Sequence, residues 1–331
     1  MKNKTLTISV AAYNSQDYLD RAIDSCLVNN LDQLEIIIVD DGSTDDTGII
    51  ADTYASEYPD SVKVIHKNNG HYGSAFNASL GIARGKYYKL LDSDDWLNKG
   101  ALQEYIDILN ASDADIALTP CVRHIEGETE LIDPAGNLDS GVYASNDIGI
   151  LKIPEGISNL TFSTAFLREI GIKLLEGCGY VDNELRIITW MKARRIQVNH
   201  LPLYNVYKGR ADQTTSLESL QQNATASKKV FWSTFEKSWK GKDIKSPSAS
   251  EIASLNALGD LASSYYISVL LSKLDKNDAA NELRNYDYLL REAGEHIYKL
   301  AGKNRYVSLL RRTNFFLFPV VRKVLLARWK Y

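Results

Sequence analysis

Short apolar runs alternate with helix-like periods along the first hundred residues. Apolar runs at residues 6–12, 35–39, 61–66 and 86–91 predict four strands. Tyr18, Ala22 and Cys26 recur at helical spacing after the first run, and residues 74–83 repeat that spacing after the third. A further helix is expected after residues 40–43, with Ser43 or Thr44 as its N-cap. The pattern is that of alternating strands and helices.

This alternation predicts an α/β fold with a doubly wound, mostly parallel sheet. Ligands bind beyond the carboxyl ends of the strands in such sheets. Each of the four predicted strands ends in a polar cluster, at Tyr13-Asn14, Asp40-Asp41, residues 66–69 and residues 92–95. We therefore expect these four clusters to meet at one edge of the sheet and to form the binding site there.

The pattern changes twice farther along the chain. Alternation becomes less regular from about Asp113 to Lys208, with one clear helix at residues 182–194, and the chain reads as helical almost throughout after about Thr215. We expect residues 1–112 to bind a donor and residues 113–214 to form the acceptor-binding half of the same domain. A helical extension is expected at residues 215–331.

Composition narrows the class of protein. The 331 residues are 44% hydrophobic and 24% charged, with a net charge of -4, which excludes a disordered chain and gives no reason to expect nucleic-acid binding. The three cysteines are far apart, which favours a reduced, cytoplasmic protein. No secretory signal is evident, and no apolar stretch approaches the roughly 18 to 20 residues that span a bilayer.

The C-terminal residues carry an uneven charge. Residues 303–331 contain eight basic residues, no acidic residue and many aromatic and aliphatic ones. A basic amphipathic tail suits peripheral contact with an anionic membrane, here the inner membrane face. A terminal helix packed on the domain, with its basic face in water, fits the same pattern equally well.

The run Asp92-Ser93-Asp94-Asp95 places three carboxylates at the exit of a predicted strand. A cation would offset their repulsion, and oxygen ligands favour Mg²⁺ or Mn²⁺ completed by substrate phosphates. Composition alone would favour a solvated acidic turn. The position at the carboxyl edge of a sheet favours a metal site instead, with Asp94 and Asp92 as the metal ligands.

Two further polar residues follow neighbouring strands. Asp41 can accept a hydrogen bond from a uracil ring or a ribose hydroxyl, although Asp-Asp-Gly-Ser alone is more often only a turn. Lys67 can pair with a phosphate or with Asp41, whereas a lone exposed lysine is usually only solvated.

Four segments together resemble the inverting family 2 glycosyltransferases. They are TISVAAYN at residues 7–14, IIIVDDGSTDDT at 36–47, residues 66–96 with LDSDDW at their end, and YVDNEL at 180–185. The resemblance covers roughly residues 5 to 210. It implies a GT-A fold and a nucleotide-sugar donor, commonly linked to UDP.

The resemblance also implies site residues. Tyr13 and Asp41 correspond to residues that contact the base, and Asp92-Ser93-Asp94 corresponds to the family's Asp-x-Asp motif, which contacts ribose and metal. Ala11-Ala12 departs from the Ile-Pro pair often found there, which puts base contacts at Ala11 in doubt. The implied donor-binding residues are Ala11, Tyr13, Asp41, Lys67, Asp92, Ser93, Asp94, Asp95 and Arg210.

The catalytic base of the family lies in a Glu-Asp pair at the start of a helix, and this chain has Val181-Asp182 there. The resemblance thus implies Asp182 as the base, with Glu184 in reserve; an ordinary N-cap is the structural alternative for Asp182. Arg210 or Lys208 is expected to close over the diphosphate.

These observations predict a metal-dependent inverting transferase that adds one sugar to a glycan or lipid-linked acceptor in cell-surface polysaccharide synthesis. A homodimer is considered as its assembly. Sugar transfer to a polyprenyl phosphate is an alternative within the same fold. A nucleotidyltransferase would need a glycine-rich phosphate loop near the first strand, and a non-catalytic partner subunit would not need Asp41, Asp94 and Asp182 together.

Overall fold

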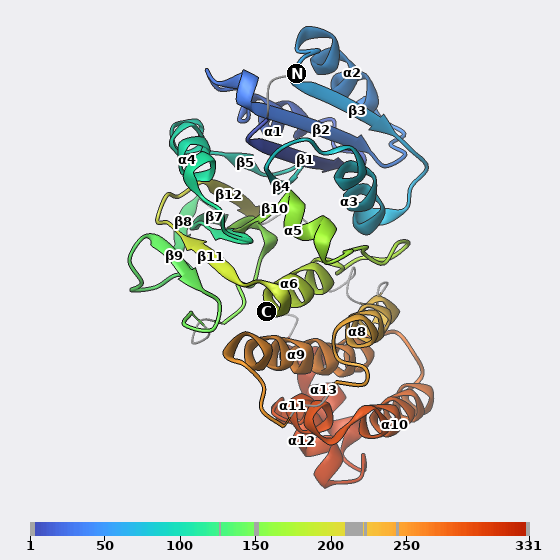
Figure 1. Ribbon diagram of the computed structural model, residues 1–331. Helices are drawn as coiled ribbons and strands as arrows, with labels where there is room; N and C mark the ends of the chain where they lie inside the picture. Colours follow the sequence, from blue (N-terminus) through green and yellow to red (C-terminus); the bar gives the residue numbers. More distant parts are fainter. Residues whose placement is uncertain are drawn as a thin grey trace. The chain divides into compact units, whose positions relative to one another are not determined.

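The computed structural model describes residues 4–125, 127–148, 152–208, 221, 224–242 and 245–328. The chain divides into two compact units, Met1–Gly209 and Arg210–Tyr331. The first unit is a layered α/β structure, and the described part of the second consists of helices (Figure 1).

A large mixed sheet forms the centre of the first unit (Figure 1). Its strands, in spatial order, are β3 (Val62–His66), β2 (Leu34–Asp40), β1 (Leu6–Ala12), β4 (Tyr87–Asp92), β10 (Leu160–Ser163), β6 (Ile116–Leu118), β11 (Arg195–Val198) and β9 (Gly141–Ala144). The first four strands run parallel to one another. All seven residues of β2 are buried, because helices cover both faces of a doubly wound sheet. The predicted fold class is confirmed.

Helices connect and cover the strands of this sheet. They are α1 (Leu19–Asp24), α2 (Thr47–Glu57), α3 (His71–Ile82), α4 (Lys99–Ala111), α5 (Thr164–Glu169) and α6 (Asp182–Lys192), with short 3-10 turns at Leu31–Gln33 and Ile157–Asn159. The helix after β2 begins at Thr47, later than expected, and neither Ser43 nor Thr44 is its N-cap. Both residues instead hydrogen-bond Asn14 in the loop after β1. Ser43 and Thr44 therefore connect the loops after β1 and β2 instead of capping the helix.

A second, smaller sheet lies beside the first. Its order is β5 (Trp96–Leu97), β12 (Tyr204–Lys208), β7 (Cys121–Ile125) and β8 (Glu128–Ile132). Strand β5 follows the acidic run directly and pairs antiparallel with β12. The second sheet therefore holds in place the residues that directly follow Asp92–Asp95.

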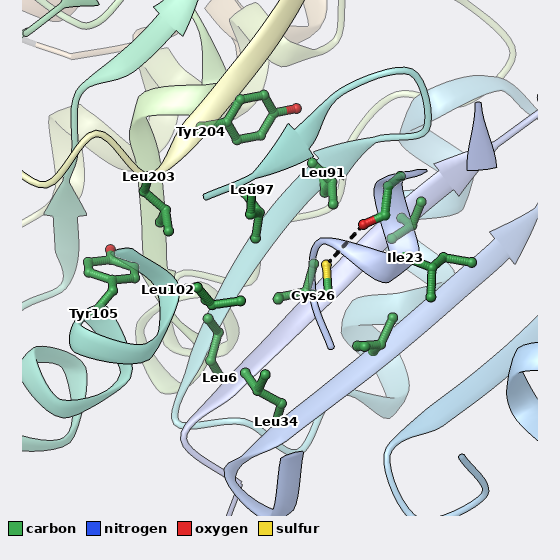
Figure 2. Close-up of a cluster of buried hydrophobic side chains, with 14 of the residues drawn as sticks. Leu6, Ile23, Cys26, Leu34, Leu91, Leu97, Leu102, Tyr105, Leu203 and Tyr204 are labelled. Atoms are coloured by element: carbon green, nitrogen blue, oxygen red, sulfur yellow. Dashed lines mark hydrogen bonds between the residues drawn. The ribbon is translucent and has the colours of Figure 1, made fainter. Parts of the chain in front are cut away.

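The core of the first unit lies between β1, β2, β4 and the helices α1 and α4 (Figure 2). Leu6, Leu34 and Leu102 are wholly buried in it. The buried residues of α4 recur at helical spacing and form the apolar stripe of an amphipathic helix; they are Ala101, Leu102, Tyr105, Ile106 and Leu109. Cys26 donates a hydrogen bond to the carbonyl of Ala22 (3.3 Å), and burial raises the pKa of its thiol to about 12. All three cysteines are buried and free of disulfides.

The second unit packs its helices around α9. The helices are α8 (Ala224–Ser238), α9 (Ala249–Leu271), α10 (Lys276–Ala293), α11 (Glu295–Ala301), α12 (Arg305–Arg312) and α13 (Phe318–Arg328). Helix α9 begins with a reciprocal capping box between Ser248 and Glu251. Within the described ranges, no helix has the length and apolar character needed to cross a membrane.

One charged residue lies in the middle of the large sheet. Lys89 on β4 is wholly buried, and its ammonium donates to the carbonyl oxygens of Ser158 (2.9 Å) and Leu160 (3.3 Å). It also lies 5.2 Å from the centre of the Tyr204 ring. Burial lowers the pKa of Lys89 to about 7, because the charged form loses its hydration.

The buried lysine makes stability depend on pH. Between the native pKa of about 7 and the ordinary value of 10.5, the unfolded chain binds a proton that the native chain does not. Native stability should therefore rise as the pH increases through that range. Lys89→Met should flatten this rise, as measured by urea unfolding at several pH values. Lys192→Met, at an exposed position at the end of α6, is the control and should keep the wild-type slope. An unchanged slope in Lys89→Met would contradict the prediction.

Candidate functional site

The polar clusters that follow β1, β2, β3 and β4 meet at the carboxyl edge of the large sheet. Strand register explains why, since Ala11 lies opposite Asp92, Ala12 opposite Asp40, and Asp40 opposite His66. Four parallel strands in this register must end at the same level. The structure thus brings together Tyr13, Asp41, Lys67 and the acidic run, as expected from the sequence.

The acidic run forms a cluster of three carboxylates. One oxygen from each of Asp92, Asp94 and Asp95 lies within 4.8 Å of the others. Burial, together with repulsion from neighbouring carboxylates, raises the pKa of both Asp92 and Asp95. Asp92 Oδ1 is buried and has no hydrogen-bond partner among the described residues. An unsatisfied buried oxygen among three crowded carboxylates fits a hard divalent cation such as Mg²⁺ or Mn²⁺.

Contacts from distant segments hold this cluster in place. The Ser93 hydroxyl hydrogen-bonds the Ser15 hydroxyl at 2.7 Å. The Asp95 carboxylate accepts the backbone N–H of Tyr207 at 2.7 Å. The backbone N–H of Asp92 donates to the Tyr204 hydroxyl at 3.0 Å. The carboxylates are therefore positioned by the loop after β1 and by β12 as well as by their own strand.

Arg21 on α1 makes a further contact with the acidic run. Its guanidinium donates to the backbone carbonyl of Asp94 at 2.5 Å and lies 4.2 Å from the centre of the Trp96 ring. It also lies 5.4 Å from the centre of the Tyr207 ring. The planar guanidinium is well suited to such stacking. Arg21 thus positions the Asp94 backbone, a role that the sequence pattern did not reveal.

Asp40 and Asp41, although adjacent, have different partners. The Asp40 carboxylate accepts the Ser43 N–H (2.9 Å) and pairs with His66 (3.0 Å), so it fastens the loop to β3. The Asp41 carboxylate pairs with Lys67 at 2.6 Å and accepts the Gly70 N–H at 3.0 Å. Of the two partners expected for Lys67, the structure shows Asp41.

Tyr13 and Ala11 flank this pair on β1 and its loop. The Tyr13 ring is 52% exposed, so it is available to stack on a base, and Ala11 is partly buried in the strand opposite Asp92. Asn14 follows in a left-handed conformation, with φ of 48°, and its side chain accepts the Thr44 N–H at 2.8 Å. The loops after β1 and β2 are thereby fixed to each other beside Tyr13.

Asp182, from a later part of the first unit, lies near the same site. It is the first residue of α6, and its charge contributes to the raised pKa values of Asp92 and of the buried Tyr72 hydroxyl. Val181, rather than Asp182, occupies the N-cap position, so the structural alternative of an ordinary N-cap does not describe Asp182.

Glu184, the reserve candidate for the base, has a structural contact. Its side chain is wholly buried and accepts the backbone N–H of Leu175 at 2.8 Å. A buried carboxylate bound to the backbone is poorly placed to reach an acceptor hydroxyl. Between the two carboxylates, the geometry favours Asp182.

The loop that leads to Asp182 contacts the residues at the start of α3. The Gly70 carbonyl accepts the Gly177 N–H at 2.9 Å, while the Gly70 N–H donates to Asp41. At Gly73, a Cβ atom would lie 2.1 Å from the carbonyl oxygen of Leu175, so only glycine fits. Asn77 binds the backbone of Leu174 through both its amide nitrogen and its oxygen (2.9 Å each).

Arg210 or Lys208 was expected to close over a diphosphate. The charge of Lys208, at the end of β12, counteracts the raised pKa of Asp92, so the two side chains lie near each other. Arg210 lies outside the described residues.

Comparisons with known proteins agree with this geometry. The glycosyl transferase family 2 model matches residues 7–169. An uncharacterised glycosyltransferase of Nostoc sp. is 32% identical over 151 residues, which cover 46% of this chain and 46% of the relative. The chain spans less than half the length of the first curated relatives that it matches.

Two solved structures share the fold. S. aureus TarS 1-349 in complex with UDP-GlcNAc superposes with a TM-score of 0.56 at 20% identity, covering 94% of this chain and 92% of the 1-349 chain. The mannosyltransferase PcManGT from Pyrobaculum calidifontis, in complex with GDP-Man and Mn²⁺, gives a TM-score of 0.55 at 15% identity, covering 99% and 88%. The fold of the first unit is therefore the GT-A fold. Within the chain, residues 7–169 match the glycosyl transferase family 2 model.

Proposed function

We propose that the protein is a metal-dependent, inverting glycosyltransferase that moves one sugar from a nucleotide-sugar, with a UDP-sugar as the proposed donor, to a hydroxyl of a glycan or lipid-linked acceptor. The observation that carries this proposal is the meeting of Asp41, the Asp92–Asp95 cluster and Asp182 at one edge of the sheet. Synthesis of a cell-surface polysaccharide is the process that we assign to it.

Donor binding is assigned to residues 1–112 and acceptor binding to residues 113–214, with residues 215–331 as the helical extension. Tyr13 and Asp41 would hold the base, Lys67 would orient Asp41, and Asp92 and Asp94 would be the ligands of Mn²⁺ or Mg²⁺. When bound there, the ion would supply positive charge to offset the negative charge that develops on the departing diphosphate. Asp95 is tied to Tyr207 and would fix the position of the metal ligands.

The transfer is a single displacement. The Asp182 carboxylate takes the proton of the acceptor hydroxyl as its oxygen bonds to the anomeric carbon. The bond from that carbon to the diphosphate oxygen breaks at the same time, and UDP leaves with the electron pair. Attack from the face opposite the leaving group inverts the anomeric configuration.

The solved relatives support a nucleotide-sugar donor, since TarS is in complex with UDP-GlcNAc and PcManGT with GDP-Man and Mn²⁺. A cytoplasmic location and a homodimer stay predictions. Transfer to a polyprenyl phosphate would use the same donor site, and the acceptor distinguishes it from the leading proposal.

Donor hydrolysis tests the proposed function. Purified protein is incubated with a panel of UDP-sugars and GDP-mannose, and release of the nucleoside diphosphate is measured with Mn²⁺, with Mg²⁺ and with a chelator. We expect release from at least one donor that stops with the chelator. No release, together with no metal-dependent binding of UDP by calorimetry, would show the proposal to be wrong.

A further inference from the structure

Helix α13 carries apolar residues on two of its faces. Phe318, Val321 and Leu325 are at most 4% exposed and pack into the second unit, where α13 contacts α9. Val320 and Val324 are 56% and 44% exposed. A helix that only packed on the second unit would need apolar residues on the inward face alone, the face of Phe318, Val321 and Leu325.

The turn before α13 adds a third exposed apolar side chain. Asn314 and Phe315 both adopt left-handed conformations, with φ of 46° and 61°. Such conformations are unfavourable for a bulky residue, so the surrounding packing must hold them. The turn buries Phe315 at 5% exposure and leaves Phe316 at 82%. We call Phe316, Val320 and Val324 the outer stripe.

Positive charge surrounds the outer stripe. Two arginines make contacts within the second unit. Arg311 pairs with Asp287 at 2.5 Å. Arg322 donates hydrogen bonds to the backbone carbonyls of Ser272 and Leu274. Arg312, Lys323 and Arg328 are exposed. At 100° per residue, Lys323 and Arg328 fall on opposite sides of the line through Val320 and Val324. Their stems can lie along an apolar surface while their charges stay in water.

We propose that the outer stripe and its flanking basic residues dock on a bilayer surface rich in anionic lipid. Apolar side chains would enter the boundary between headgroups and acyl chains, and the cations would meet lipid phosphates. A second copy of this chain is a poor partner for the face, because residues 303–331 hold eight basic residues and no acidic one, so two such faces repel.

In this proposal, both interpretations of the C-terminal residues, a membrane-binding tail and a packed terminal helix, apply to α13. One face of α13 packs on the unit, and another is open for the membrane. This docking surface is distinct from the donor site, and its test does not depend on the proposed activity.

Vesicle sedimentation tests the proposal with the full chain. The vesicles contain phosphatidylglycerol mixed with phosphatidylcholine, or phosphatidylcholine alone. The stripe variant is Phe316→Ser/Val320→Ser/Val324→Ser, and the charge variant is Arg312→Ser/Lys323→Ser/Arg328→Ser. Ile49→Ser/Ile125→Ser/Leu131→Ser is the matched control, because it removes three exposed apolar side chains from the first unit.

We expect wild type and control to bind anionic vesicles and to release them at high salt. The stripe variant should bind roughly tenfold more weakly, and the charge variant roughly a hundredfold more weakly. Donor hydrolysis in solution should be unchanged in both variants, which separates loss of docking from loss of activity. Thermal melting shows whether a variant has failed to fold. If one variant has, the vesicle binding of the other variant decides the test.

Three results would overturn the proposal. Equal binding of wild type and both variants to anionic vesicles would remove the docking role, as would equal binding of wild type to phosphatidylcholine alone. A stripe variant that changes from dimer to monomer by light scattering, with vesicle binding unchanged, would assign the face to a second copy.

Discussion

Asp94→Asn is expected to abolish metal-dependent binding of UDP. The substitution removes one of three carboxylates whose oxygens lie within 4.8 Å of one another, so the cluster loses a charged ligand while keeping its shape. Loss of a direct ligand should weaken Mn²⁺-dependent affinity for UDP by more than about a hundredfold, beyond the effect of removing an outer-shell partner. Isothermal calorimetry of UDP with and without Mn²⁺ measures this.

The matched control is Asp107→Asn, at an exposed position on α4 away from the carboxyl edge. It should bind UDP like the wild type. If Asp94→Asn kept the wild-type dependence on Mn²⁺, the metal would have to be held elsewhere, and the assignment of the cluster would be wrong.

Asp182→Asn is expected to spare UDP binding and to stop transfer. An amide cannot take the proton of the acceptor hydroxyl, and general-base catalysis is commonly worth about 10²–10⁴-fold in rate. The Asn side chain keeps the shape of the helix start, so the donor site should remain intact. Initial rates with a competent acceptor, beside calorimetry with UDP and Mn²⁺, separate the two effects.

Glu184→Gln gives the contrast within the same helix. Because Glu184 is buried and accepts the Leu175 N–H, its neutral variant should lower the melting temperature more than Asp182→Asn does.

Equal losses of UDP affinity in Asp94→Asn and Asp182→Asn would contradict the division of roles between metal ligand and base.

The donor edge was predictable because its signals are local. Apolar runs ending in Asp41 and in Asp92–Asp95 indicate parallel strands, and parallel strands align their ends, so periodicity alone brings these residues together. The sequence could not reveal Arg21, because its contact with Asp94 joins residues 73 positions apart and its spacing on α1 is that of any solvated arginine.

Helix ends and faces were harder to predict. Ser43 and Thr44 are good N-cap residues, yet Asn14 competes for them from a loop that is distant in sequence. For α13, apolar residues occur on two faces, so the pattern alone did not reveal which residues pack inward. Tyr72 on α3 reads as an ordinary core aromatic, although its hydroxyl lies near Asp92 and Asp182.

The contacts of Gly70 and Gly73 limit how this enzyme can be re-engineered. Gly70 joins Asp41 to the loop before Asp182 through its two backbone groups, and Gly73 makes room for Leu175. A chimera in which residues 113–214 come from another glycosyltransferase would lose these contacts unless residues 70–77 and 174–177 come from the same protein. Exchange of residues 113–214, the proposed acceptor-binding residues, therefore requires that α3 be exchanged with them.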